Sequence, residues 1–318
     1  MFRRNFFALA FAAVALLAGP ANAQTAWPKE RELTLIVAVG PGSSAELAAR
    51  EVARVISRET GASVVVKAIA GGGGLVGFGA VASAKPDGYT MGLVNVGSLV
   101  FLPFVQDVPF SIDSFDFLGA VSAGHYGIGV GKNSPIKTIE DLIALGKKRV
   151  VTFSTDTVLN ALPMFQLSNL TGMKSQIVMS KTQPESVAQA VGGHVDVVVQ
   201  GLPVMQSIID AGDMRLLAST TPSRWPTMPN VRTLREMGYN AEVVLPAGYA
   251  MPKGVPLAIR EKLQEAILKS AKDPALIDMM TKLNIGMMPL TGKEFENFVR
   301  VQKPLVGKVV EAAGMAKK

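Results

Sequence analysis

Residues Leu33–Arg50, LTLIVAVGPGSSAELAAR, have the types and order of a binding site for a small anion. An apolar, β-branched run predicts a strand over Leu33–Val39, and Gly40–Gly42 predicts a tight turn after it. Either Ser43 or Ser44 suits the N-cap of the helix that follows, because a serine hydroxyl accepts a hydrogen bond from a first-turn N–H. Such a helix start gathers unpaired N–H donors at the positive end of the helix dipole, so it predicts an anion cradle.

Six residues of this segment are candidate ligand contacts because they lie in the turn or at the start of the helix. They are Val39, Gly40, Gly42, Ser43, Ser44 and Glu46. An acid in the first turn also interacts favourably with the helix dipole, so Glu46 is expected either to contact a ligand or only to stabilise the helix. The alternative for the whole segment is an ordinary serine-capped connection.

The rest of the chain alternates short β-branched runs with helical patterns, which predicts βαβ units with parallel strands. The expected strands are Leu33–Val39, Ser63–Ala68, Tyr89–Val94, Gly127–Val130, Arg149–Ser154, Gln176–Met179, Val195–Gln200 and Arg215–Thr220. The expected helices are Glu46–Thr60, Leu75–Ala84, Ile139–Leu145, Leu159–Leu170, Glu185–Val191, Val204–Ala211, Pro256–Lys269, Pro274–Leu283 and Lys293–Ala313. Pro304 is expected to kink or interrupt the last helix.

Two such units, with C-terminal helices left over, predict a chain that crosses between two lobes more than once. Open α/β sheets bind ligands beyond the carboxyl ends of their strands, so the loops after the strands are candidate binding loops. In the second unit, Thr155, Thr157 and Asn160 follow a strand and can donate hydrogen bonds. Gln200 ends another strand aimed at the same cleft and offers both a donor and an acceptor.

The N-terminus has the pattern of an export signal. Arg3 and Arg4 form a basic region, Phe6–Ala18 is an apolar run, and Ala21–Ala23 has the small-x-small pattern of a cleavage site. We therefore expect cleavage after Ala23 and a periplasmic location. A membrane anchor is the alternative, but its apolar run would have to be longer to span a bilayer.

Composition narrows the function classes. Removing 23 of the 318 residues leaves 295, about two domains' worth, and losing two arginines lowers the formal charge from +7 to +5. The absence of cysteine excludes disulfides, thiol chemistry and thiolate metal sites. The basic excess is interleaved with acids, and four Tyr and two Trp offer few stacking surfaces, so we expect no nucleic-acid partner.

Several segments, taken in order, resemble one family. They are Trp27-Pro28, Ala70–Gly77 (AGGGGLVG), Ala84–Thr90 (AKPDGYT), Gly192–Asp196 (GGHVD), Ala211–Arg215 (AGDMR) and Arg224–Gly238 (RWPTMPNVRTLREMG). Over residues 27 to 315 the chain resembles the substrate-binding proteins of tripartite tricarboxylate transporters, also called Bug receptors. AKPDGYT and the Arg224–Gly238 run are the specific segments, since glycine runs alone would be weak.

The resemblance implies an α/β, two-lobed fold of the type II periplasmic-binding-protein class, with two doubly wound sheets joined by a hinge. It implies one lobe from residues 24–124 and 245–318 and a second from 125–244, closing over a small organic anion. Backbone N–H groups and hydroxyls typically hold the carboxylate in such proteins. The implied function is a monomeric, exported receptor that needs no cofactor and delivers a carboxylate to membrane permease subunits.

The resemblance adds candidate contacts and also shows where this chain departs from the family. Gly97 and Ser98 match a loop that touches ligand, and Lys181 lies where the family often has Tyr-Lys-Gly; an ordinary turn and a solvated lysine are the alternatives. Asp156 stands in a segment that is commonly glycine-rich, and an acid near an anionic ligand weakens binding. Asp156 therefore either caps the next helix, which we favour, or meets an amine or hydroxyl of the ligand.

A periplasmic hydrolase is the main alternative from another class. The chain has no G-x-S-x-G elbow and no H-E-x-x-H motif, and with two histidines it cannot build a multi-histidine metal site. His125, near the expected lobe crossover, and His194 are both expected to be structural. We therefore expect a binding protein and not an enzyme, with no metal. A receptor of the same fold that signals to a membrane sensor is the remaining alternative.

Overall fold

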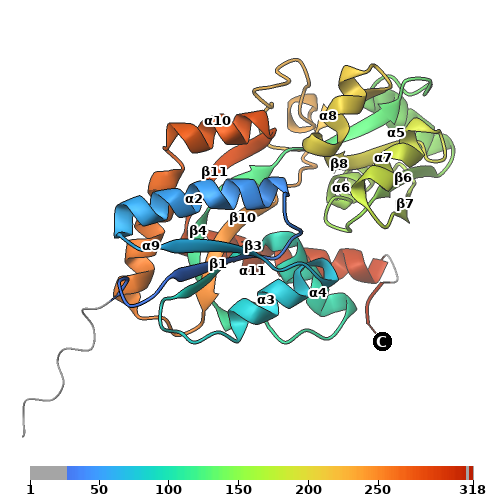
Figure 1. Ribbon diagram of the computed structural model, residues 1–318. Helices are drawn as coiled ribbons and strands as arrows, with labels where there is room; N and C mark the ends of the chain where they lie inside the picture. Colours follow the sequence, from blue (N-terminus) through green and yellow to red (C-terminus); the bar gives the residue numbers. More distant parts are fainter. Residues whose placement is uncertain (1–26, 313–314, 318) are drawn as a thin grey trace, which may run out of the picture.

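Two β-sheets, each with helices against both faces, make up the computed structural model (Figure 1). The structure describes residues 27–312 and 315–317, so the expected export signal lies outside the described residues. The fold is the two-sheet α/β architecture that we expected. Both sheets are mixed, however, because the strands nearest the crossings between them run antiparallel to their neighbours.

The first sheet has the strand order β11-β4-β10-β3-β1-β2. Its strands are β1 (Leu33–Val37), β2 (Val64–Ala68), β3 (Thr90–Asn95), β4 (Phe115–Gly124), β10 (Pro246–Pro252) and β11 (Ile285–Thr291). β1 pairs in parallel with β2 and β3, as β-branched runs joined through helices favour, whereas β10 is antiparallel to β3 and β4.

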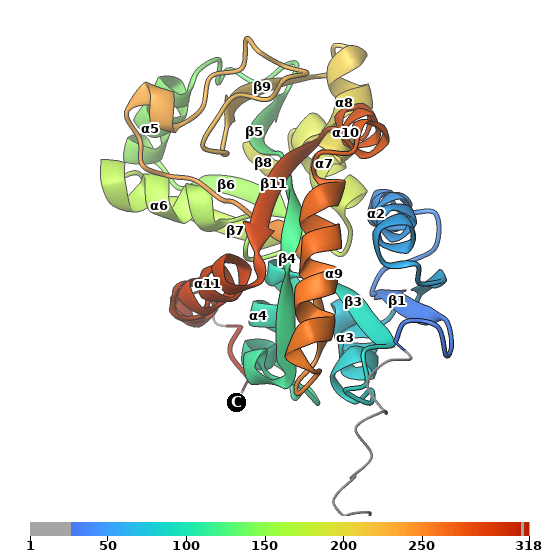
Figure 2. The same cartoon turned by 90° about the vertical axis from the view of Figure 1, so that its left-hand side faces the viewer.

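Helices cover both faces of this sheet (Figure 2). One core cluster holds α2 (Ser44–Thr60), α9 (Leu257–Ser270) and α10 (Pro274–Lys282) against one face. A second cluster holds α3 (Leu75–Ala82), α4 (Val96–Val105) and α11 (Gly292–Ala312) against the other face. The sheet is thereby buried on both sides. The packing of α2 and α4 on its two faces positions the starts of these helices at its edge.

The second sheet has the strand order β7-β6-β8-β5-β9. Its strands are β5 (Tyr126–Gly131), β6 (Val151–Thr155), β7 (Ser175–Met179), β8 (Val197–Gly201) and β9 (Met214–Ser219). Its helices are α5 (Ile139–Lys148), α6 (Leu162–Thr171), α7 (Gln183–Val191) and α8 (Leu202–Asp210). Helices α5 and α6 pack on one face, and α7 and α8 pack on the other.

The chain passes between the sheets at His125, which separates β4 from β5, and again between β9 and β10. We retain residues 24–124 plus 245–318 and residues 125–244 as our proposal for the two lobes.

Several elements differ from the sequence expectation. The strands β4, β10 and β11 and the helix α4 were not predicted, because glycine, alanine and proline interrupt the strand patterns and α4 is apolar on every side. The last helix is not interrupted at Pro304: α11 is continuous from Gly292 to Ala312. Pro304 lacks one N–H donor, but its side chain is exposed, so the helix keeps its packing on both sides of it.

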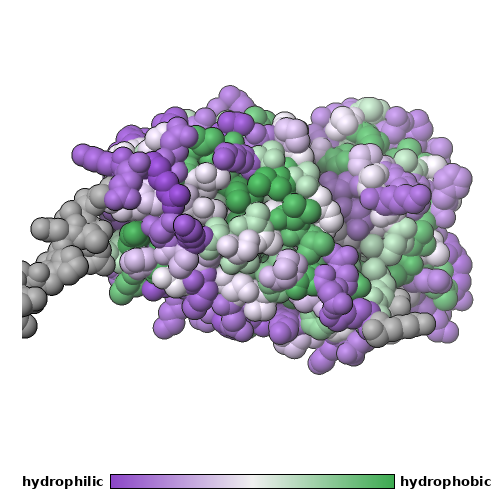
Figure 3. All heavy atoms as spheres, turned by 60° about the horizontal axis from the view of Figure 1, so that its bottom comes forward, coloured by the Kyte–Doolittle hydropathy of each residue, from purple (hydrophilic) through white to green (hydrophobic). Residues whose placement is uncertain are grey.

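None of the helices in the described ranges has the length and apolar character needed to cross a membrane. Apolar residues do gather on the surface that faces the viewer when the bottom of Figure 1 is turned forward (Figure 3). Helix α3, at the bottom of Figure 1, carries the side chain of Val76, which is 51% exposed. Apolar surface of this kind is common where proteins meet partners.

Candidate functional site

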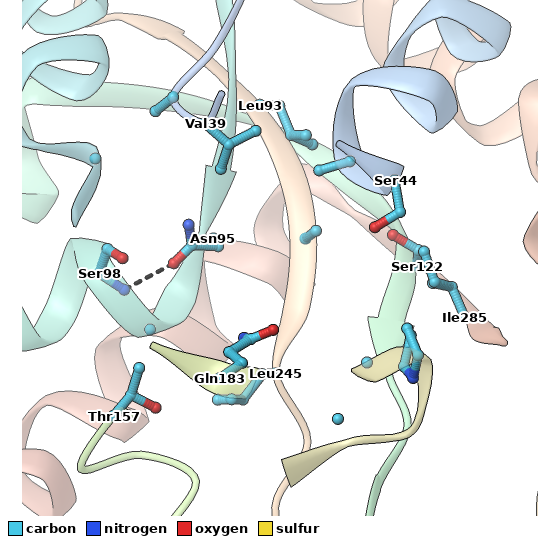
Figure 4. Close-up of a pocket in the computed structure, with 18 of the residues that line it drawn as sticks. Val39, Ser44, Leu93, Asn95, Ser98, Ser122, Thr157, Gln183, Leu245 and Ile285 are labelled. Carbon is cyan, nitrogen blue, oxygen red and sulfur yellow. Dashed lines mark hydrogen bonds between the residues drawn. The ribbon is translucent and has the colours of Figure 1, made fainter. Parts of the chain in front are cut away.

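A cavity of about 640 Å³ is lined by residues of both sheet units. Its volume is that of a site for a small molecule. Its wall consists largely of segments that follow β1, β2, β3, β6 and β8, together with the crossing at His125 and with Met280, Asn284 and Ile285. Figure 4 shows ten of the lining side chains with labels, among them Val39, Ser44 and Thr157. Eight predicted contacts line it: Val39, Gly40, Ser44, Gly97, Ser98, Asp156, Thr157 and Asn160. Their contact with a ligand stays a prediction.

Helix α2 begins at the cavity wall. Ser43 is the N-cap, with its hydroxyl accepting a hydrogen bond from Glu46 N at 3.2 Å, so its side chain is used by the helix. Ser44 follows in the first turn and lines the cavity. The N–H groups of Ser44 and Ala45 lie in the first turn of α2. They have no acceptor inside the helix, because no helical carbonyl lies one turn before them. These groups are available to an anion.

Glu46 stabilises this turn and does not line the cavity. Its side chain is buried, and Oε2 accepts a hydrogen bond from Gly42 N at 2.6 Å while Oε1 pairs with Arg50 Nη2 at 2.5 Å. The Gly42 N–H, followed by the Arg50 guanidinium, holds the pKa of Glu46 below its ordinary value. Gly42, Ser43 and Glu46 therefore shape the cradle from behind.

Asn95–Ser98 is not an ordinary turn but the start of a second helix. Asn95 is the N-cap of α4, and its Oδ1 accepts a hydrogen bond from Ser98 N at 2.7 Å. Gly97 and Ser98 lie in the first turn and line the cavity. Figure 4 shows Asn95 and Ser98 on one side of the space and Ser44 on another. Two helix starts from the first sheet thus reach the same cavity.

Asp156 lies in the turn after β6 and does not cap α6, so that expectation is wrong. The N-cap of α6 is Ala161, with no side-chain cap. Asp156 Oδ1 instead accepts hydrogen bonds from Gln200 Nε2 at 2.7 Å and from Asn160 Nδ2 at 3.2 Å. Asp156 lies five residues before this N-cap, whereas a capping side chain belongs to the N-cap residue itself. Asp156, half-buried, and Asn160, buried, both line the cavity.

Three predicted contacts of the second unit lie away from the wall. Gln200 is buried, and besides Asp156 its Nε2 donates to Ser186 Oγ at 2.9 Å, so it supports the turn from behind. Thr155 is also buried. Lys181 is exposed before α7, where its N–H donates to Glu185 Oε2 at 2.9 Å; its neighbour Gln183 lines the cavity instead.

The crossing between the sheets contributes two ring side chains that the sequence analysis did not assign to the site. His125 lines the cavity and stacks on Trp225, with ring centroids 5.6 Å apart. Burial lowers the pKa of His125 to about 4, so its imidazole is neutral at neutral pH. Tyr126 also lines the cavity, and burial, together with the charge of Asp156, raises its pKa to about 12.

Other lining residues were also missed. They include Gly71, Gly73, Gly74, Ser122, Gln183 and Asn284, whereas Asn95 belongs to the Asn95–Ser98 segment that matches the family's ligand loop. Gln183 had a usable signal, because a Thr-x-Pro after a strand marks a helix start. Ser122 and Asn284 had none, since they belong to or adjoin strands with no clear alternation.

The chain matches the model of the tripartite tricarboxylate transporter family receptor over residues 48–315. The chain belongs to this family. BugT of Bordetella pertussis is 30% identical over 283 residues, which cover 84% of each chain. A TctC solute binding protein from Polaromonas has a TM-score of 0.78 at 20% identity, covering 90% of this chain and 99% of that one. An R. palustris protein with adipate has a TM-score of 0.74 at 23% identity, covering 91% of this chain and 99% of that one.

These structural likenesses show the type II periplasmic-binding-protein fold. The tripartite tricarboxylate transporter receptors are solute-binding proteins and not enzymes. The cavity of this receptor fits that role, because α2, α4, α7 and α8 all begin at its wall. Among the residues that the structure describes, Asp156 is the only charged side chain in the lining. No group of His, Asp or Glu residues in the described ranges could hold a metal ion.

Proposed function

We propose that this receptor works in the periplasm, where it captures a small carboxylate-bearing solute and delivers it to the membrane permease subunits of a tripartite tricarboxylate-type transporter. The observation that carries the proposal is the meeting of the α2 and α4 starts at one cavity, where Ser44, Gly97 and Ser98 line the wall. First-turn N–H groups and serine hydroxyls bind a carboxylate without an arginine or lysine. The R. palustris protein of the same fold holds adipate, which supports this ligand class.

A thermal-shift screen tests the ligand class directly. The chain without residues 1–23 is heated with mono-, di- and tricarboxylates, aromatic acids and amino acids, and with neutral sugars and simple amines as controls. A ligand at 100 times its Kd should stabilise the fold by about 2.7 kcal/mol. Stabilisation by a sugar or a simple amine, with no response to any acid, would refute the proposal.

Closure and export have separate tests. Small-angle X-ray scattering should show a smaller radius of gyration with ligand than without it, because residues 125–244 move toward the rest of the chain. An unchanged scattering curve at saturation would contradict lobe closure.

Residues 1–23 fused to alkaline phosphatase should give periplasmic activity, and a fusion that stays inactive in the cytoplasm would contradict export.

Delivery to a permease is tested by uptake. A host that expresses the receptor together with the permease genes that neighbour it should take up the ligand, and omitting the receptor should abolish that uptake. If a sensor gene stands beside this one and transport does not depend on the receptor, the signalling role replaces the transport role.

A further inference from the structure

The two ends of the cavity differ in charge. On the first-sheet side the wall has the starts of α2 and α4 with their first-turn N–H groups, whereas on the second-sheet side it has the Asp156 carboxylate. The helices of the second unit offer fewer free donors. Leu202 N–H, at the start of α8, already donates to His125 O at 2.8 Å, and both α7 and α8 have proline in the first turn.

Asp156 presents one oxygen to the cavity. Its Oδ1 is occupied by the amides of Gln200 and Asn160, at 2.7 and 3.2 Å. Within the described part of the chain, no hydrogen bond ends on Oδ2. Asp156 is half-buried in the lining, so Oδ2 is the acceptor that a ligand meets.

No positive side chain in the described lining of the cavity balances this carboxylate. In the described lining there is no lysine or arginine, His125 is neutral, and Tyr126 stays protonated because burial and the Asp156 charge raise its pKa to about 12. A carboxylate enclosed without a positive charge beside it costs free energy, and a second carboxylate from the ligand would add repulsion. A ligand amine would remove both costs at once.

We propose that the receptor selects solutes that carry a carboxylate at one end and a protonated amine at the other, with the amine bound to Asp156 Oδ2. The carboxylate lies at the starts of α2 and α4, and a carbon chain spans the apolar wall formed by Leu93, Phe101 and Leu245. This inference rests on the proposed function, because it assumes that the helix starts hold a carboxylate. It narrows the ligand class from carboxylates in general to amino acids whose amine is distant from the acid.

The test compares ligands that differ only at one end. Calorimetric titrations use γ-aminobutyrate against glutarate, δ-aminovalerate against adipate, and ε-aminocaproate against pimelate, which are matched in their number of methylenes. The hydroxy acids of the same lengths form a third series. We expect at least one amino acid to bind the wild-type receptor more tightly than its matched diacid and its hydroxy acid.

Asp156→Asn provides the reciprocal arm. The asparagine keeps an Oδ1 acceptor for Gln200 and Asn160 but places an NH₂ donor where Oδ2 was, so the fold is retained and the preference should reverse. Amino-acid affinity should fall roughly ten- to hundredfold, the effect of losing a hydrogen bond to a charged group, and diacid affinity should rise. Asp156→Glu should keep the preference for amino acids over diacids, but with the tightest binding moved to amino acids with shorter carbon chains. Asp107→Asn, at a side chain that is 99% exposed, should change neither series.

The outcomes separate the two proposals. Diacids that bind the wild type as tightly as amino acids, with affinities unchanged in Asp156→Asn, would overturn this inference and leave the carboxylate receptor standing. A preference for hydroxy acids that disappears in Asp156→Asn would show that Asp156 binds a ligand hydroxyl and not an amine. This result would also overturn the inference. If no acid of any series binds, this inference fails, and the proposed function fails with it only when the thermal-shift screen also finds no acid that binds.

Discussion

Gln200 Nε2 donates a hydrogen bond to Asp156 Oδ1 across 2.7 Å, which joins the end of β8 to the turn after β6. Gln200 is fully buried, and its second Nε2 contact, to Ser186 Oγ at 2.9 Å, fixes the amide against α7. The amide therefore decides which oxygen of Asp156 faces the cavity. A residue with no contact to the cavity thus sets the chemistry of its wall.

Gln200→Glu should be more destabilising than Gln200→Leu at neutral pH. The leucine removes the Gln200 donor from Ser186 and from Asp156, which keeps only the Asn160 amide, and a buried polar group that loses its partner costs about 1–3 kcal/mol. The glutamate places a second carboxylate against Asp156, which adds like-charge repulsion. Urea unfolding at neutral and mildly acidic pH measures both variants. Equal stabilities, or a difference that does not shrink on acidification, would show that repulsion between the two carboxylates does not set the stability of Gln200→Glu.

The sequence could predict the anion cradle because its signals are local. A β-branched strand, a Gly-Pro-Gly turn and a serine cap are each recognised within a few residues, and β1 and α2 follow them. The direction of a side chain on a strand buried on both faces has no such signal. Gln200 lies at the end of β8 and is buried in the second unit's interior, whereas Lys181, just after β7, is exposed to solvent.

The opposite wall was harder to predict because it depends on pairing over long distances. β4 and β10 are rich in glycine and alanine and lie side by side only in the folded sheet. Ser122 on β4 reaches the cavity through that pairing, and His125 does so because the chain changes sheet there. Neither relationship leaves a periodic pattern in the sequence.

Glu46→Gln should lower the melting temperature at neutral pH without a large change in ligand affinity, because Glu46 supports the turn from outside the cavity. The folded-state pKa of Glu46 lies below its ordinary value of 4.5, chiefly through the Gly42 N–H. Its stabilisation is therefore complete above pH 4.5 and is lost as the pH falls through the lowered value. Wild-type and variant melting curves should converge in acid. Glu30→Gln, at an exposed acid, is the control, and a gap that persists in acid would contradict the explanation by a charged Glu46 carboxylate.

His125 should make the fold less stable in mild acid. Burial lowers its pKa from 6.5 to about 4, so between these values the unfolded chain binds a proton that the folded chain excludes. Its contribution is complete above pH 6.5 and declines as the pH falls toward 4. His125→Phe removes the titration and keeps a ring against Trp225, so it should flatten the melting temperature over this range. His194→Gln, at an exposed histidine, should leave the pH dependence of the melting temperature unchanged. If His125→Phe keeps the full pH dependence of the wild type, the acid sensitivity belongs to other groups.

Gly97→Ala should weaken ligand binding by interfering with the contact between the two units. A Cβ at Gly97 would lie 3.0 Å from Leu159 Cδ1, and Leu159 belongs to the apolar cluster around α3, α4 and α11 although it lies in the second unit. The extra methyl opposes this contact only when the units are together, because Gly97 belongs to α4 of the first unit and Leu159 to the segment between β6 and α6 of the second. We expect a loss of roughly 1 kcal/mol, about fivefold in affinity. Calorimetric titration measures it, and the melting temperature without ligand should change little.

A double-mutant cycle decides whether the effect passes through Leu159. Leu159→Ala alone removes buried apolar contacts, so it should lower stability by about 2–5 kcal/mol and weaken closure for a different reason. The same truncation makes room for the methyl of Gly97→Ala, so the double variant should bind more tightly than the sum of the single effects predicts. Val158→Ala, at a neighbouring buried residue of the same cluster, is the control that removes apolar contacts without making that room. If the effects of Gly97→Ala and Leu159→Ala are additive, the α4 start is perturbed locally, and the contact between Gly97 and Leu159 does not govern closure.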